Sequence, residues 1–461
     1  MSKRTILKGT LILTVAGIAT KLLGFYNRIF LTRLIGVIEL GKYQLVFPIY
    51  MFVFAFCSQG IATTLTKQVS YYIGRKNEEK ADYIFRISIL ISVSLSLILA
   101  SIIYGASDFI SLTLLKNTDC GALLRIITLA IPFVALKSCI NFYFIGIDKP
   151  MFHGLSHFIE QVIRIGSAYI LSLCVITEKV NAQLAVIAVV IGEISATFIA
   201  IIIYYVNKHS ENTTRIIGDN KQNENKINNK VFHSKTTNQK LSLQEKQKTL
   251  RYFANDAIPI TINNLILTLF STFEAIIMPA MLYYYYNDSD MALETFGIIT
   301  GIVIPFILFP ATITTSLSTM LLPAVSYANA QHDTRTINKA LKNCILFCIL
   351  LGLCASAGFL LLGEPICTFA FKSKEAGILL RKLCLLCPLI YTSGNLTAIL
   401  NGIDKSFFAL ICNIISISIR IAFIFLLVPH YGLNAYAMGM FVSYTTINLL
   451  MLLGIRNFKA L

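Results

Sequence analysis

Residues 9–36 read GTLILTVAGIATKLLGFYNRIFLTRLIG, a stretch long and apolar enough to cross a bilayer as one helix, for which about 20 residues suffice. Lys21 and Arg28 lie far from either end, and a cation at the centre of a lipid-facing helix costs about 2.5–3.5 kcal/mol. Successive spacings of three or four residues place on one helix face Thr14, Gly17, Lys21, Gly24, Arg28 and Thr32. The alternative, in which the cations reach the lipid headgroups, suits Arg33 better than Lys21. The stretch therefore predicts a helix that turns a cationic face towards a cavity.

The composition of the chain is that of a membrane protein. Of its 461 residues, 56% are hydrophobic and 13% are charged, and apolar runs of spanning length recur from end to end. The first run is too long for a cleavable signal and lacks an A-x-A site. Cys384 and Cys387 form a CxxC without a second pair or a histidine cluster, so we predict a packing role, no metal site and no cofactor. The predicted fold class is an all-α polytopic membrane protein.

About twelve spans of the length that a bilayer requires can be placed along the chain. They lie near 9–34, 42–70, 84–105, 122–146, 154–175, 182–206, 256–283, 294–327, 341–363, 377–401, 407–429 and 433–455. Lys and Arg gather at both termini and in alternate connections, whereas the loops between are poor in basic residues. By the positive-inside rule we predict that both termini are cytoplasmic, in a multi-pass protein of the cell membrane.

One polar segment, 207–251, divides the chain into lobes of residues 1–206 and 252–461. It is rich in Asn, Lys and Gln, with ten Lys or Arg against four acidic residues, and such a composition cannot bury a core. We therefore predict a cytoplasmic linker without much regular structure. Basic inner loops of this kind account for most of the net charge of +16, which favours anionic membrane lipids as partners. No nucleic-acid-binding signature accompanies the charge, so nucleic acid is not predicted as a partner.

The two lobes are copies of one unit. A constant shift of 256 residues carries Val69-Ser70-Tyr71 onto 325–327, Pro132 onto Pro388, and Gly146-Ile147-Asp148-Lys149 onto 402–405. It also carries Ile163-Arg164-Ile165 onto 419–421. Each unit has an even number of spans, so the repeats are parallel and related by an axis along the membrane normal. Transporters built in this way place the substrate site between their halves.

The differences between the copies point to function. Glu160 and Arg164 are spaced to form a pair on one helix, whereas Ser416 takes the place of the glutamate in the second copy. Arg420 then needs another acid, because a buried unpaired charge is expensive, and Glu274 is the best candidate. The first pair is interpreted either as a packing salt bridge or as part of a substrate site. Glu274 either balances Arg420 or forms an ion-coupling site for a monovalent cation or proton, a site to which we also assign Arg420 and Asn413.

The first lobe has further basic residues within its spans. Lys21, Arg28 and Lys137 have no intramembrane counterparts under the shift. We therefore predict that the half-cavity near the first and fifth spans is the more positive one. An amphiphilic anion suits such a site, and a phosphate headgroup suits it best.

The chain resembles the multidrug/oligosaccharidyl-lipid/polysaccharide exporter superfamily, and within it the stage V sporulation protein B-like branch. The resemblance covers nearly the whole chain and is carried by residues 8–36, by LGKYQLVFPIYMFVFAFCSQGIATTLTKQVS, by IEQVIRI after GIDKP, and by ITGIVIPFILFPATITTSLSTMLLPAVS. The first and last stretches are also similar to the lipid II flippase. Two basic residues of that flippase, in its second and eighth helices, have no match in 49–58 or 296–304. The resemblance implies a V-shaped, two-lobed transporter that works by alternating access.

The function implied is a flippase, not an enzyme, that moves an undecaprenyl-diphosphate-linked oligosaccharide, a peptidoglycan or polysaccharide precursor, to the outer leaflet. The predicted substrate-binding residues are Lys21, Asn27, Arg28, Thr32, Glu160 and Arg164. One alternative is a multidrug cation antiporter of the same fold, which requires an acidic cavity. Another is a membrane glycosyltransferase or polymerase, which requires a sizeable outer loop bearing acids or a base. A non-transporting scaffold gives no reason for cations in the middle of a span.

Overall fold

The computed structural model describes residues 3–75, 77–174, 181–224, 242–331 and 333–459, and within these ranges every regular element is a helix. The first half comprises α1 (Lys3–Phe54), η1 (Ala55–Gln59), α2 (Gly60–Gly74), α3 (Glu78–Phe109), η2 (Ile110–Leu114), α4 (Cys120–Thr128), α5 (Ile131–Gly146), α6 (Pro150–Cys174) and α7 (Ala182–Glu224). The second comprises α8 (Leu243–Tyr286), α9 (Ser289–Gly297), η4 (Ile298–Val303), α10 (Ile304–Leu308), α11 (Ala311–Ala330), α12 (Thr334–Phe371), α13 (Lys374–Leu383), η5 (Cys384–Leu386), α14 (Cys387–Gly402), α15 (Ser406–Leu426), α16 (Val428–Tyr431) and α17 (Leu433–Lys459).

The helices have the lengths of membrane spans. Among the described residues, nine stretches are long and apolar enough to cross a bilayer, or up to ten if the bent pair α4 and α5 counts as one span. Two more of the twelve expected passes are missing from this count, and each absence has a simple explanation. α6 carries Glu160 and Arg164, which lower its hydropathy, and the first of the nine stretches, Gly17–Gly74, contains a reversal of the chain.

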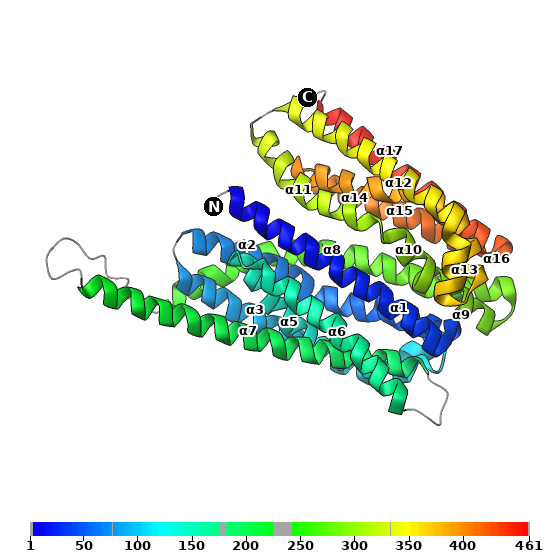
Figure 1. Ribbon diagram of the computed structural model, residues 1–461, viewed down its shortest axis with the longest axis horizontal. Coiled ribbons are helices and arrows are strands. Elements are labelled where there is room, and N and C mark those ends of the chain that lie inside the picture. The colour runs from blue at the N-terminus through cyan, green and yellow to red at the C-terminus, as the bar shows by residue number, and fades with distance from the viewer. Residues whose placement is uncertain (1–2, 76, 175–180, 225–241, 332, 460–461) are drawn as a thin grey trace.

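That reversal lies at Gly36, inside α1. Its φ of 81° and ψ of 173° are not helical, and a residue with a Cβ rarely adopts such a positive φ. Figure 1 shows the blue N-terminal segment of α1 crossing the molecule from the end that bears both termini, whereas α2 lies back near that end. Gly36 thus separates the first two spans without an intervening loop, where the sequence had suggested a short connection.

The duplicated sequence produces duplicated local structure. Lys116 and Lys372, 256 residues apart, both adopt a left-handed conformation, with φ of 51° and 55°. Asp148 and Asp404, separated by the same shift, have φ of 64° and 60°. The N-terminal caps of α3 and α12 also correspond, because Asn77 accepts from the Lys80 N–H and Asp333 from the Thr336 N–H. Equivalent turns at equivalent positions confirm two repeats of one fold.

The two repeats form the two sides of the molecule (Figure 1). Helices α2–α7 lie on one side and α11–α17 on the other, with α1 and α8 between them, and the N- and C-termini lie at the same end of the helices. This is a two-lobed arrangement of parallel repeats. The helices flanking the predicted linker run further into it than the sequence suggested, since α7 continues to Glu224 and α8 begins at Leu243. Of the predicted linker, residues 225–241 lie outside the described residues.

At the end away from the termini, the halves are in close contact. A Cβ on Gly41 of α1 would lie 2.3 Å from the Leu293 carbonyl oxygen, and one on Gly297 would lie 2.5 Å from that of Val37. Glycine at both positions lets the backbones of α1 and α9 touch. Nearby, the Phe25 ring packs edge-on against Phe306, with ring centroids 4.6 Å apart. This contact closes one end of the space between the lobes.

Candidate functional site

A cavity of about 440 Å³ lies between the two halves, next to this closed end. The N-terminal segment of α1 contributes Lys21, Asn27 and Arg28, and α6 contributes Gln161 and Arg164. The second half adds the apolar side chains Pro305, Leu308 and Phe309. Residues that are far apart in the sequence therefore form one chamber with basic side chains on one wall and apolar side chains on the other.

The predicted cationic face of α1 is only partly turned to this cavity. Lys21 is exposed and makes no hydrogen bond or ion pair within the described part of the chain. Asn27 is 7% exposed, and its Oδ1 has no partner among the described residues. Thr32 does not line the cavity, and its hydroxyl donates to the Arg28 carbonyl of the same helix at 2.8 Å. The hydroxyl group is therefore bound within α1, as is common for threonine in helices.

Arg28 reaches across the cavity to the second half. Its Nη1 donates to the carbonyl oxygens of Thr300, at 3.2 Å, and Gly301, at 3.0 Å. Both carbonyls belong to the π-helical turn η4, where the Ile304 N–H bonds Ile299 instead of Thr300. Gly301 also lacks its ordinary helical donor, because residue 305 is proline and has no N–H. The guanidinium thus bonds to carbonyls that the helix leaves without their usual partners.

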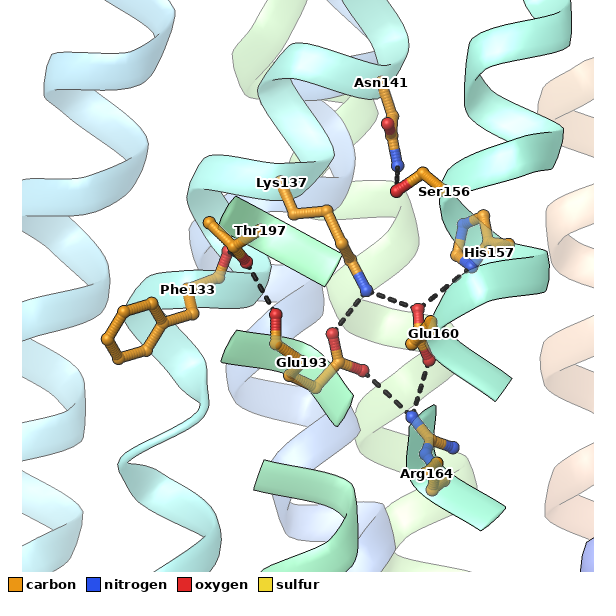
Figure 2. Close-up of polar contacts among 9 residues, drawn as sticks. All are labelled: Phe133, Lys137, Asn141, Ser156, His157, Glu160, Arg164, Glu193 and Thr197. Carbon is orange, nitrogen blue, oxygen red and sulfur yellow. Dashed lines mark hydrogen bonds and ion pairs between the residues drawn. The ribbon is translucent and has the colours of Figure 1, made fainter. Parts of the chain in front are cut away.

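The Arg164 guanidinium belongs to a buried network of four charged side chains (Figure 2). Its Nη2 lies 2.6 Å from Glu160 Oε1 on α6 and 3.2 Å from Glu193 Oε1 on α7. The Lys137 ammonium on α5 lies 2.5 Å from Glu160 Oε2 and also contacts Glu193. His157 completes the cluster, with Nδ1 3.2 Å from Glu160 Oε2. Buried charges at these positions are tolerable because each has partners of opposite sign.

This network corrects the prediction that Lys137 makes the first half-cavity more positive. Two cations face two carboxylates, so their formal charges cancel, and the excess positive charge at the cavity comes from Lys21 and Arg28. Glu160 lies 3% exposed within the network and does not line the cavity that holds Lys21. Arg164 lines that cavity but is already paired.

Glu193 belongs to this network and was missing from the sequence prediction. Gly192 beside it allows α7 to approach α6, because a Cβ there would lie 3.2 Å from that of Arg164. A carboxylate in the middle of the sixth predicted span is the same signal that had singled out Glu160. Its partners, however, lie on other helices, and their identity required the packing.

In the second half, the predicted pair is present. Arg420 Nη2 lies 2.9 Å from Glu274 Oε2, and both line a cavity of about 270 Å³. Asn413 does not line this cavity, and its Nδ2 donates to the Ala409 carbonyl one turn earlier at 2.8 Å. Ser416, which stands where the first half has Glu160, bonds the Ser443 hydroxyl at 2.6 Å. The second half therefore has one ion pair where the first has a network of four charges.

The described residues contain no group of three or more His, Cys, Asp or Glu side chains arranged to hold a metal ion. The described part of the chain forms bundled helices of spanning length in two repeats, with a polar chamber between them. The fold is similar to that of solved transporters of the multidrug/oligosaccharidyl-lipid/polysaccharide exporter superfamily. Residues 6–327 match the polysaccharide biosynthesis protein family, and the chain belongs to that family.

Known proteins agree with this assignment. The chain is 25% identical over 454 residues to the stage V sporulation protein B of Bacillus subtilis (strain 168), covering 98% of this chain and 83% of that protein. Its fold is similar to a multidrug resistance MATE family transporter in an inward-facing conformation, with a TM-score of 0.70 at 14% identity and 96% of each chain covered. It is also similar to the lipid II flippase MurJ in an inward closed conformation, with a TM-score of 0.69 at 15% identity, covering 97% of this chain and 87% of that one. Together, the family match, these relatives and the two-lobed helical fold support a membrane flippase or exporter.

Proposed function

We propose that the protein carries an undecaprenyl-diphosphate-linked oligosaccharide from the inner to the outer leaflet by alternating access. The observation that supports this most is the cavity between the halves, where Lys21 has no partner within the described residues and Arg28 lies 7 positions further along the same helix. A diphosphate can accept several charge-assisted hydrogen bonds from such cations. Asn27 lies beside them with an unbonded carbonyl oxygen, and its amide group can donate.

The buried acids argue against the multidrug antiporter as an alternative. A carrier of organic cations needs a carboxylate that is free to meet its substrate. Glu160 and Glu193 contact Lys137 and Arg164, and Glu274 contacts Arg420. Within the described residues, the charge that remains without a partner in the central cavity is the ammonium of Lys21.

The distribution of Lys and Arg along the chain supports one orientation in the membrane. We propose that residues 1–206 and 252–461 are the two lobes and that both termini and the linker lie in the cytoplasm, because these segments carry most of the Lys and Arg outside the spans. The contact of Gly41 with α9 then lies at the outer end. With that end closed, the cavity is loaded from the cytoplasmic leaflet.

The test is translocation of an undecaprenyl-diphosphate-linked disaccharide in vesicles containing the purified protein. Each lost hydrogen bond to a charged group is worth about 1.5–3 kcal/mol, so Lys21→Ala and Arg28→Ala should each slow transport by at least about tenfold. Lys21→Arg should retain much of the rate, because phosphate accepts either cation. Arg86→Ala removes an exposed cation of α3 outside the cavity and serves as the control. Wild-type rates in the Lys21→Ala and Arg28→Ala variants would refute the proposed substrate class.

A further inference from the structure

A second cavity, of about 300 Å³, lies within the first half directly beside the central one. The two cavities share Phe47, Gln161 and Arg164 in their walls. The second one extends from there between α1, α5, α6 and α7, where Ser138, Asn141 and His153 line it. A ligand held by Lys21 and Arg28 can therefore have a neighbouring group in this second chamber.

Several polar atoms of this chamber lack partners. Ser138 is 5% exposed, and its hydroxyl oxygen has no hydrogen-bond partner among the described residues. The same holds for Nδ1 of His153 and Nε of Arg164. Buried polar groups in proteins are almost always hydrogen-bonded, so these three atoms around one cavity are available to bond to a ligand that enters it.

The charges of the chamber indicate which kind of ligand it suits. Glu160, Glu193, Lys137 and Arg164 all line it, and they are paired with one another. An added net charge of either sign would therefore meet no unpaired counter-charge. A neutral ligand rich in hydroxyl groups, which both donate and accept, can bond to all three unpartnered atoms.

The remaining wall is aromatic and apolar. Phe47, Tyr50, Phe54 and Phe142 line the chamber, and aromatic rings can pack against the C–H faces of a sugar ring. Its volume is at the lower end of the roughly 300–1,000 Å³ found for small-molecule sites, which suits a small headgroup. We propose that this chamber binds the neutral sugar next to the diphosphate of the lipid substrate. The inference rests on the proposed function and assigns a separate part of the same substrate to separate residues.

The experiment compares binding of bare undecaprenyl diphosphate with binding of the same lipid carrying a hexose, an N-acetylhexosamine or a disaccharide of the two. The wild-type protein should bind at least one sugar-bearing lipid more tightly than the bare lipid. Ser138→Ala removes one hydrogen bond and should reduce this sugar-dependent gain by about fivefold. His153→Phe removes Nδ1 but keeps a ring that can pack on His157 and Phe142, and it should act in the same way. Affinity for the bare lipid should stay unchanged in both variants.

Ser88→Ala is the matched control, because Ser88 is also buried, its hydroxyl is also unpartnered among the described residues, and it does not line the chamber. It should leave the sugar-dependent gain intact. The inference fails if no sugar strengthens binding, or if the gain survives both Ser138→Ala and His153→Phe. Failure of the proposed function is seen separately, as absent binding of bare undecaprenyl diphosphate or as normal binding in Lys21→Ala.

Discussion

Arg28 donates to the carbonyl of Gly301 at 3.0 Å, so a cation that faces the central cavity also holds the two halves of the protein together. The residues on either side of this contact come from the first and eighth predicted spans. A phosphate that enters the cavity competes with the carbonyl for the same guanidinium. Under the proposed function, substrate binding and separation of the halves at the closed end would thereby be linked through one side chain.

Arg28→Gln should weaken the closed end. The loss of about 1.5 kcal/mol of charge-assisted bonding changes the ratio of closed to open molecules by about tenfold. Spin labels on ketone-bearing amino acids at 116 and 372, the equivalent turns of the two repeats at the end away from the termini, should report longer distances in the variant. Lys21→Gln removes a charge from the same helix without touching η4, and it should leave the distances unchanged. Equal distances in wild type and Arg28→Gln would contradict the link.

Gly297→Ala should disturb the same end by a steric route. The new methyl group would lie 2.5 Å from the Val37 carbonyl oxygen and 2.9 Å from the Gly41 nitrogen, and neither backbone atom can move aside cheaply. We expect longer distances between labels at 116 and 372 and slower transport. Gly105→Ala adds the same methyl group where nothing lies within 4 Å, and its transport should match wild type. If Gly297→Ala also matches wild type, α1 and α9 do not need this close contact.

The buried network predicts that the stability of the protein depends on the balance among its four charges and not on any one of them. Lys137→Met leaves two carboxylates facing one arginine and should cost about 3–5 kcal/mol. Under the 256-residue shift the second repeat has Ser393 and Leu449 at the positions of Lys137 and Glu193. Lys137→Ser combined with Glu193→Leu therefore restores a balanced pair and should recover most of the stability. Thermal unfolding of the purified variants measures both changes, and a double variant as unstable as Lys137→Met would show that packing, not charge, dominates.

The pair in the second half allows the same kind of experiment. Glu274→Gln leaves Arg420 buried without a counter-charge, which should lower the unfolding temperature, and adding Arg420→Ser should partly restore it. Additive losses in the double variant would instead support an independent ion-coupling role for Glu274. Asn413→Ala is the control, because its side chain bonds only the backbone of its own helix among the described contacts.

Much of this architecture could be predicted from the sequence, because apolar length and the 256-residue repeat depend on local pattern alone. The partner of Arg420 could also be inferred, since a buried cation needs an acid and the second half has few within its spans. Glu193 was missed because its partners lie on two other helices. Thr32 shares a face with Lys21 in the sequence, yet hydrogen bonding within its own helix decided where its hydroxyl went. The periodicity of the sequence gives the direction in which a side chain points from its helix, but not which residues it contacts.

Charge cancellation in the first half also determines how the membrane voltage acts on the carrier. A group of zero net charge does no electrical work when it moves as a unit through a uniform field, so the network of Lys137, Arg164, Glu160 and Glu193 can move as a whole at any potential. The ion pair of Arg420 with Glu274 also has zero net charge and does no electrical work when it moves as a unit. The field then acts on Lys21 and Arg28, at about 2.3 kcal/mol per charge for each 100 mV. Under the proposed function, a bound diphosphate would offset these charges and the empty carrier would be pulled back towards the negative side, so the return step would be the voltage-sensitive one.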